Sequence, residues 1–205
     1  MNVRPNAGSI LRDAVVRAAL PRAVDACRAG RAGKRGDRDA FASIAAASVD
    51  RCYALAYRIL RDPHRAQDAA QQALLGAWRD LPTLRDVERF DAWLHRLVVN
   101  ACYVEARSER RWTARVRVLR SEPETADIAR SVAARDELDA AFRQLSPEHR
   151  AVVVLHHHMG YQLTEIAETL GIPAGTARSR LHHAVKQLRE ALDASEPAAV
   201  GGQSA

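Results

Sequence analysis

Residues 163–188 read LTEIAETLGIPAGTARSRLHHAVKQL, and this stretch decides the fold. Ile166 and Leu170 share one face of a first helix, and Gly171 stands where a left-handed residue ends such a helix. We expect Ile172 to pack back onto this helix and Pro173 to occupy the first position of a second one. The second helix carries apolar residues at steps of three and four, namely Ala177, Leu181, Ala184, Val185 and Leu188.

The other positions of the second helix form a polar outer face. They are Thr176, Arg178, Ser179, Arg180, His182, His183, Lys186 and Gln187. A short helix followed by a helix with donors on its outer face is the helix-turn-helix arrangement that reads the major groove of DNA. The alternative is a helical hairpin with a solvated charged face. The agreement between the glycine, the proline and the apolar period favours the helix-turn-helix.

Charge and composition set outer bounds on the function. The chain has 205 residues and a formal net charge of +6, and residues 1–35 hold eight Lys or Arg residues but only two Asp residues. The remaining residues therefore carry equal numbers of basic and acidic side chains, which argues against a protein that coats nucleic acid indiscriminately. No apolar run approaches the roughly 20 residues that span a membrane. The three widely spaced cysteines indicate a reducing compartment and no disulfide framework.

Breaker residues and composition divide the chain into five parts. These are a basic arm (1–35) that we expect to be flexible, a helical block (36–111), a linker (112–134), a second helical block (135–192) and a disordered tail (193–205). The arm allows at most a helix over 10–29, broken near Pro21. It has no assigned role, and its composition also fits an organelle transit peptide, although the rest of the chain favours a bacterial source.

Each helical block has its own apolar pattern. In the first block we expect helices over 39–60, over 63–81 and from 89 toward 107. In the second block we expect a helix over 135–145, and then one that Ser146, Pro147 and Glu148 start and Gly160 ends. The helix-turn-helix follows. The predicted fold class is all-α, with two small helical domains joined by a flexible linker.

Two sets of motifs together resemble a known family. The first block contains DAAQQALLGAW (68–78), then FDAWLHRLVVN (90–100) and Arg107, Arg110 and Arg111. The second contains LSPE (145–148) and EIAETLGIPAGTARSRL (165–181). In this order they resemble regions 2 and 4 of bacterial RNA polymerase sigma factors, and most closely the extracytoplasmic-function group, which keeps only these two regions. The resemblance covers about two thirds of the chain.

The resemblance implies a promoter-specificity subunit that acts in the cytoplasm without cofactor or catalysis. Its implied partners are core RNA polymerase, promoter DNA and an anti-sigma factor. The residues implied to bind core polymerase are Asp68, Gln71, Leu74 and Trp78. Those implied to hold the melted promoter element are Arg85, Asp86, Arg96, Asn100 and Arg107, while Trp93 is expected to anchor the core. Those implied to contact the upstream duplex are Thr176, Arg178, Ser179, Arg180, His182 and Lys186.

Two alternatives belong to other classes of protein. A stand-alone regulator would use the same helix-turn-helix but bind palindromic duplex DNA as a dimer. An enzyme or metalloprotein would need a site, and the three histidines at 156–158 are the only suggestive cluster. Consecutive histidines point in different directions around a helix and no acidic residue stands at a ligand spacing beside them, so we expect no metal site.

Overall fold

The computed structural model describes residues 7–28, 35–119 and 133–194, and these residues form helices and turns with no strand. Contacts within the chain divide it into two compact units, residues 1–105 and 106–205. The all-α prediction is confirmed. No helix among the described residues combines the length and the apolar character needed to cross a membrane.

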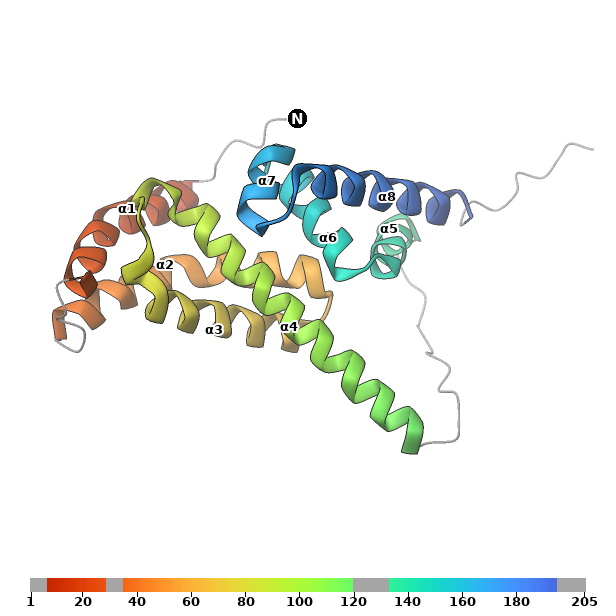
Figure 1. Ribbon diagram of the computed structural model, residues 1–205, viewed down its shortest axis with the longest axis horizontal. Helices are drawn as coiled ribbons and strands as arrows, with labels where there is room; N and C mark the ends of the chain where they lie inside the picture. Colours follow the sequence, from red (N-terminus) through yellow and green to blue (C-terminus); the bar gives the residue numbers. More distant parts are fainter. Residues whose placement is uncertain (1–6, 29–34, 120–132, 195–205) are drawn as a thin grey trace, which may run out of the picture. The chain divides into compact units, whose positions relative to one another are not determined.

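The first unit contains α1 (Ala7–Arg28), α2 (Arg35–Leu60), α3 (Pro63–Asp80) and the first part of α4 (Phe90–Leu119). Two 3₁₀ turns, η1 (Leu81–Thr83) and η2 (Val87–Arg89), lie between α3 and α4. α2 packs against both α1 and α3, and α1 also reaches η1 (Figure 1). The buried face of α3 is a stripe of alanines, at 66, 69, 70, 73 and 77, which lets its neighbours approach closely.

Most of the basic arm is α1, close to the helix over 10–29 that the sequence allowed, but this helix is not broken at Pro21. Val16, Leu20 and Val24 are buried, and their spacing of four residues places them on one face of the helix. Pro21 lies inside α1 without ending it, and its side chain is exposed. The backbone hydrogen bond that Pro21 removes would reach the carbonyl of Arg17, an exposed residue, so water can satisfy that group. Residues 1–6 and 29–34 lie outside the described part.

The predicted linker is also partly helical. α4 continues through Leu119 because neither glycine nor proline interrupts residues 112–119, and α5 (Ala133–Gln144) begins just before the predicted end of the linker. Residues 120–132 lie outside the described part. The predicted tail begins where α8 ends, at Asp193, and residues 195–205 also lie outside it.

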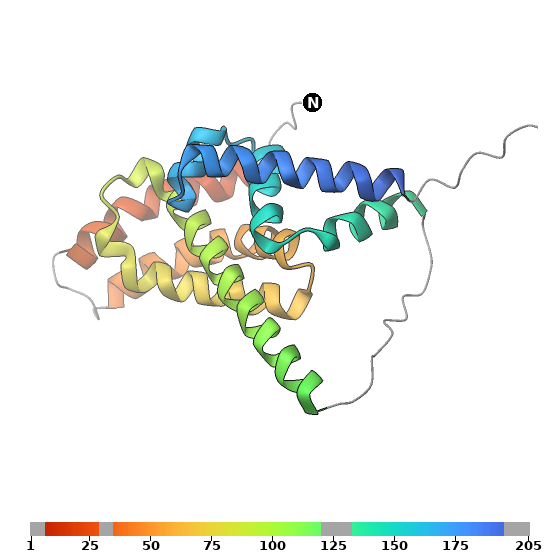
Figure 2. The same ribbon diagram turned by 45° about the vertical axis from the view of Figure 1, so that its right-hand side comes forward.

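The second unit contains α5, α6 (Pro147–Val153), α7 (Leu163–Leu170) and α8 (Ala174–Asp193), which Figure 2 shows from the side of α8. Ser146 caps α6 as predicted, since its hydroxyl accepts the N–H of His149 at 3.2 Å. The predicted continuation to Gly160 is a π-helical turn, η3 (Val154–His158), closed by a bond from the N–H of Met159 to the carbonyl of Val154 at 3.0 Å. α8 packs against α5, α6 and α7.

Candidate DNA and polymerase interfaces

The turn between α7 and α8 has the geometry that its sequence predicts. Gly171 is left-handed, with φ 65° and ψ 38°. The N–H of Ile172 donates to the carbonyl of Ala167 at 3.0 Å, and that of Gly171 to Glu168 at 3.3 Å, which is the Schellman pattern. Pro173 is the cap of α8 rather than its first residue, because its carbonyl accepts the N–H groups of Thr176 and Ala177.

The inner face of α8 holds it against the rest of the second unit. Ala177 and Ala184 are fully buried. Leu181 and Leu188 pack with Phe142 around a cluster formed by Leu145, Val153 and Ala184. The predicted apolar stripe therefore faces the core, and the opposite face is presented to solvent.

The outer face of α8 displays the polar residues predicted to contact DNA. Arg178, Ser179, His182 and Lys186 are exposed, whereas Thr176 and Arg180 are half-buried. Ser179 donates its hydroxyl to the carbonyl of Thr176 at 3.1 Å, and Lys186 lies 3.7 Å from Glu190. Within the described residues Arg178 forms no hydrogen bond or ion pair, so its guanidinium has all its donors available for a base edge.

Arg180 belongs to a small charged cluster at the start of α6. Burial by itself would raise the pKa of Glu148, but the residue's own N–H, the Ser146 hydroxyl and nearby guanidinium groups, that of Arg180 among them, lower it. Glu148 is thus held as a carboxylate near Arg180.

Three histidines make contacts within the second unit. His156 shares a 2.8 Å hydrogen bond between its Nδ1 and the carbonyl of Tyr161, which fixes the chain after η3. His149 of α6 stacks on His183 of α8, with ring centroids 6.5 Å apart. Among the described residues no group of His, Cys, Asp and Glu side chains is placed to hold a metal ion.

The helix α4 carries a second polar face. Arg96, Asn100 and Arg107 are exposed, and their spacing of four and seven residues places them on one side of the helix. Tyr103 lies between them on the same side and is half-buried. Tyr103 was not among the residues predicted to contact DNA. Trp93 is half-buried, and its ring centroid lies 5.8 Å from that of Phe90.

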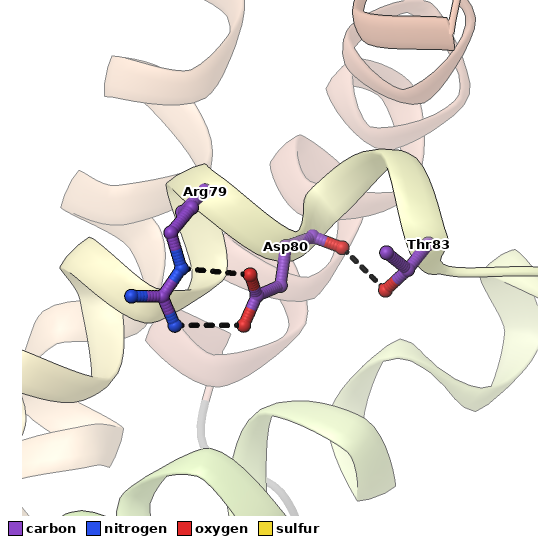
Figure 3. A network of polar contacts seen from close by, with 3 residues as sticks. All are labelled: Arg79, Asp80 and Thr83. Atoms are coloured by element: carbon purple, nitrogen blue, oxygen red, sulfur yellow. Dashed lines mark hydrogen bonds and ion pairs between the residues drawn. The ribbon is translucent and has the colours of Figure 1, made fainter.

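The loop before α4 presents the other two residues predicted to contact melted DNA. Arg85 and Asp86 are exposed, and the Asp86 carboxylate accepts the N–H of Glu88 at 3.0 Å to cap η2. Figure 3 shows how the loop starts: Arg79 binds Asp80 through two bonds, of 2.9 and 3.1 Å, and the hydroxyl of Thr83 donates to the Asp80 carbonyl at 2.6 Å. The hydrogen bond from Arg79 lowers the pKa of Asp80, which keeps this carboxylate ionised.

The outer face of α3 differs from the expected one. Asp68 and Gln71 are exposed as expected, but Leu74 is half-buried, and the ring of Trp78 meets that of Phe41 edge-on at 4.9 Å. Leu75 instead is 70% exposed. The neighbouring Gln72 donates to the carboxylate of Glu105 on α4. Leu75 is therefore the most exposed of the three large apolar side chains of α3.

Comparisons with known proteins match two regions of the chain. Residues 45–112 match the family described as Sigma-70 region 2, and residues 141–190 match Sigma-70, region 4. The ECF RNA polymerase sigma factor SigL of Mycobacterium tuberculosis is 36% identical over 141 residues, which cover 67% of this chain and 80% of the relative. The chain belongs to the ECF sigma factors. SigW of Bacillus subtilis is 28% identical over 78% of this chain and 92% of its own.

Solved structures show that the fold of this sigma factor is shared. CnrH in complex with the cytosolic domain of CnrY superposes with a TM-score of 0.57 and 22% identity, over 89% of this chain and 99% of the other. RpoE with the anti-sigma factor NepR from Bartonella quintana gives 0.56 and 23%, over 71% and 91%.

Membership of the family decides between the classes considered from the sequence. The protein is a promoter-specificity subunit of RNA polymerase, and it is not an enzyme. The stand-alone dimeric regulator is not favoured, because its sequence would not need a region 2.

Proposed function

We propose that the sigma factor reads the upstream promoter element with α8. The observation that supports this proposal most strongly is the orientation of α8. Its alanines and leucines pack inward, whereas Arg178, Ser179 and His182 face outward. Arg178 is the base-reading residue, because it is exposed and a guanidinium can bind the O6 and N7 atoms of guanine together. Thr176, Arg180 and Lys186 contact phosphates, which fix the position of the helix in the groove.

The melted element is held by α4 and the loop before it. Arg96 and Arg107 neutralise phosphates, and Asn100 offers both a donor and an acceptor to an exposed base edge. Tyr103 joins this set, since an aromatic ring between cations is the arrangement that stacks unpaired bases. Arg85 and Asp86 extend the surface from the loop, where their exposure supports a contact with DNA.

Core RNA polymerase binds the outer face of α3. Asp68 and Gln71 supply polar contacts at the rim, and Leu75 supplies the apolar anchor that Leu74 was expected to provide. A leucine exposed to 70% among polar neighbours supports this role, because such a residue gains from being covered by a partner. Trp78 supports the face from beneath through its contact with Phe41.

An anti-sigma factor is the proposed regulatory partner, and the protein acts in the cytoplasm. Two solved structures support the proposal. One contains the sigma factor RpoE with the anti-sigma factor NepR, and the other contains CnrH with the cytosolic domain of CnrY. We expect the inhibitor to cover Leu75 and α8. Native complexes isolated under non-inducing conditions should contain a small partner, and repeated recovery with polymerase alone would contradict this.

Reconstitution tests the promoter function. The protein is mixed with purified bacterial core RNA polymerase, and the complex transcribes genomic DNA fragments of the organism. We expect transcripts with specific starts that depend on the protein and disappear with Arg178→Ala plus Arg180→Ala. The matched control is Arg189→Ala, an exposed residue near the end of the same helix. If the transcripts persist in the double variant, α8 does not recognise the promoter.

A further inference from the structure

α1 is part of the first unit, yet neither matched family region includes it. The matched region 2 begins at residue 45, whereas α1 ends at Arg28. Val16 and Leu20 are 5% and 3% exposed, and Ala23 and Val24 are fully buried. A helix that did not pack on the unit would leave these apolar residues exposed, so α1 has a packing role.

The elements on which α1 packs show what that role is. α1 contacts η1, the first turn of the loop that leads into α4 (Figure 1). It also forms one wall of a cavity whose other walls come from α2, from the second turn η2 and from the start of α4. The lining residues are Val16, Arg17, Leu20 and Pro21 of α1, with Arg51, Val87, Glu88, Phe90 and Asp91. α1 therefore adjoins both turns of the loop.

Within each turn of the loop, hydrogen bonds join residues that are two or three apart, such as Leu84 to Leu81 at 3.1 Å and Arg89 to Asp86 at 3.2 Å. These bonds shape the turns. Leu81 and Leu84 are 0% and 4% exposed, so their burial holds the loop against the rest of the unit. α1 and α3 both contact η1, the turn that contains Leu81.

The other end of the loop is fixed by a charged contact that faces the same cavity. Arg51 of α2 lies 3.4 Å from Asp91 in the first turn of α4. Both residues line the cavity with Leu20 of α1. The start of α4 is thus tied to α2 on one side, and α1 lines the cavity beside it.

We infer that α1 is a positioning element for the loop from Leu81 to Arg89. By packing on η1 and by lining the cavity beside η2, α1 fixes Arg85 and Asp86 in the place from which they contact melted promoter DNA. This inference rests on the proposed role of the loop. A loop that is already ordered loses less conformational entropy on binding, so α1 strengthens the capture of melted DNA without touching it.

The test uses the full-length protein in complex with core polymerase. Leu20→Ala removes a side chain with which α1 lines the cavity beside η2, and Leu20→Met restores its volume. The matched control is Val15→Ala, because Val15 is 46% exposed on the same helix. We expect Leu20→Ala to weaken binding of the complex to a fork-junction DNA with an unpaired promoter element by about tenfold, the effect of re-ordering one or two loop residues on binding.

Two further readouts separate positioning from loss of fold. Affinity for core polymerase should change less than twofold in Leu20→Ala, because α3 carries that contact. Hydrogen exchange should accelerate at the amides of Leu84 and Arg89, while the amides of α3 keep their protection. Leu20→Met should recover both binding and protection. Parallel losses of fork binding, polymerase affinity and α3 protection would overturn the inference, because α1 would then only stabilise the unit.

A companion variant separates this inference from the function on which it rests. Arg85→Ala plus Asp86→Ala removes the proposed DNA contacts of the loop directly. If that variant binds fork DNA normally, the role of the loop is wrong. If it loses binding while Leu20→Ala does not, the role of the loop stands and the positioning by α1 is wrong.

Discussion

Leu75 and Leu74 provide the sharpest test of the polymerase-binding face, because they are adjacent in the chain and differ in burial. Leu75 is 70% exposed and Leu74 is half-buried. Full burial of a leucine side chain contributes roughly 1.5–3 kcal/mol. If core polymerase covers the exposed 70% of Leu75, the contact contributes about 1–2 kcal/mol. Leu75→Ala should then weaken binding to core polymerase by about five- to thirtyfold.

The two variants should also differ in stability, and here Leu74→Ala should have the larger effect. Leu75→Ala should change the free energy of unfolding by no more than about 0.5 kcal/mol, as is usual for an exposed site. Leu74→Ala should lower that free energy by about 1 kcal/mol or more, because it removes atoms that pack within the unit. Any loss of polymerase affinity in Leu74→Ala should follow its loss of fold.

Urea unfolding followed by circular dichroism measures the free energy of unfolding. Affinity for core polymerase is measured by competition, in which each variant displaces labelled wild-type protein from core polymerase. Leu75→Val is a milder control and should lose less affinity than Leu75→Ala. The reasoning is refuted if Leu75→Ala binds core polymerase as tightly as the wild type. It is refuted equally if Leu74→Ala loses affinity while its unfolding is unchanged.

Three other predictions follow from the same coordinates. Arg178→Ala should cost about 1–3 kcal/mol of discrimination at one base pair. Arg180→Ala should weaken binding to all sequences and reduce the slope of log affinity against log salt concentration by about one. Footprinting at several salt concentrations distinguishes the two effects. Gly76→Ala should raise the free energy of unfolding by about 1 kcal/mol, because a Cβ there meets no atom within 4 Å, and Gly171→Ala should lower it by about 1–2 kcal/mol because φ is 65°. Burial lowers the pKa of His95 from 6.5 to about 4, so the unfolded chain binds a proton between these values and the folded chain does not. Unfolding free energy should therefore fall by about 3 kcal/mol as the pH drops from 6.5 to 4, and an equal fall in His95→Gln would contradict this.

The helix-turn-helix could be predicted from the sequence because its signals are local. Gly171 and Ile172 form the turn through hydrogen bonds to residues three and five positions earlier, so a short stretch contains both partners. The inward stripe of α8 was equally readable, because leucines recur at the helical period. For the same reason the start of α6 at Ser146 was correct.

The features that sequence reasoning missed depend on distant contacts. α1 has a readable stripe at Val16, Leu20 and Val24, but its arginines and Pro21 suggested a flexible arm, and only the packing against α2 and η1 holds the helix. The different burial of Leu74 and Leu75 could not be read from the sequence, because the buried side of α3 is made of alanines, which occur on inner and outer faces alike. The π-helical turn η3 had no signal, since its hydrogen bonds resemble those of a helix shifted by one residue.

The charge balance and the two separate faces together predict weak binding of DNA by the isolated protein. Outside residues 1–35 the basic and acidic side chains are equal in number, so little net attraction draws the body to a polyanion. α8 and α4 each offer only a few cations, enough for a short contact but not for tight binding alone. When core polymerase holds both units on one promoter, the second contact becomes intramolecular and its effective concentration rises. Specific binding should therefore exceed the sum of the two separate units, and equal affinity of the free protein and the polymerase complex for promoter DNA would contradict this.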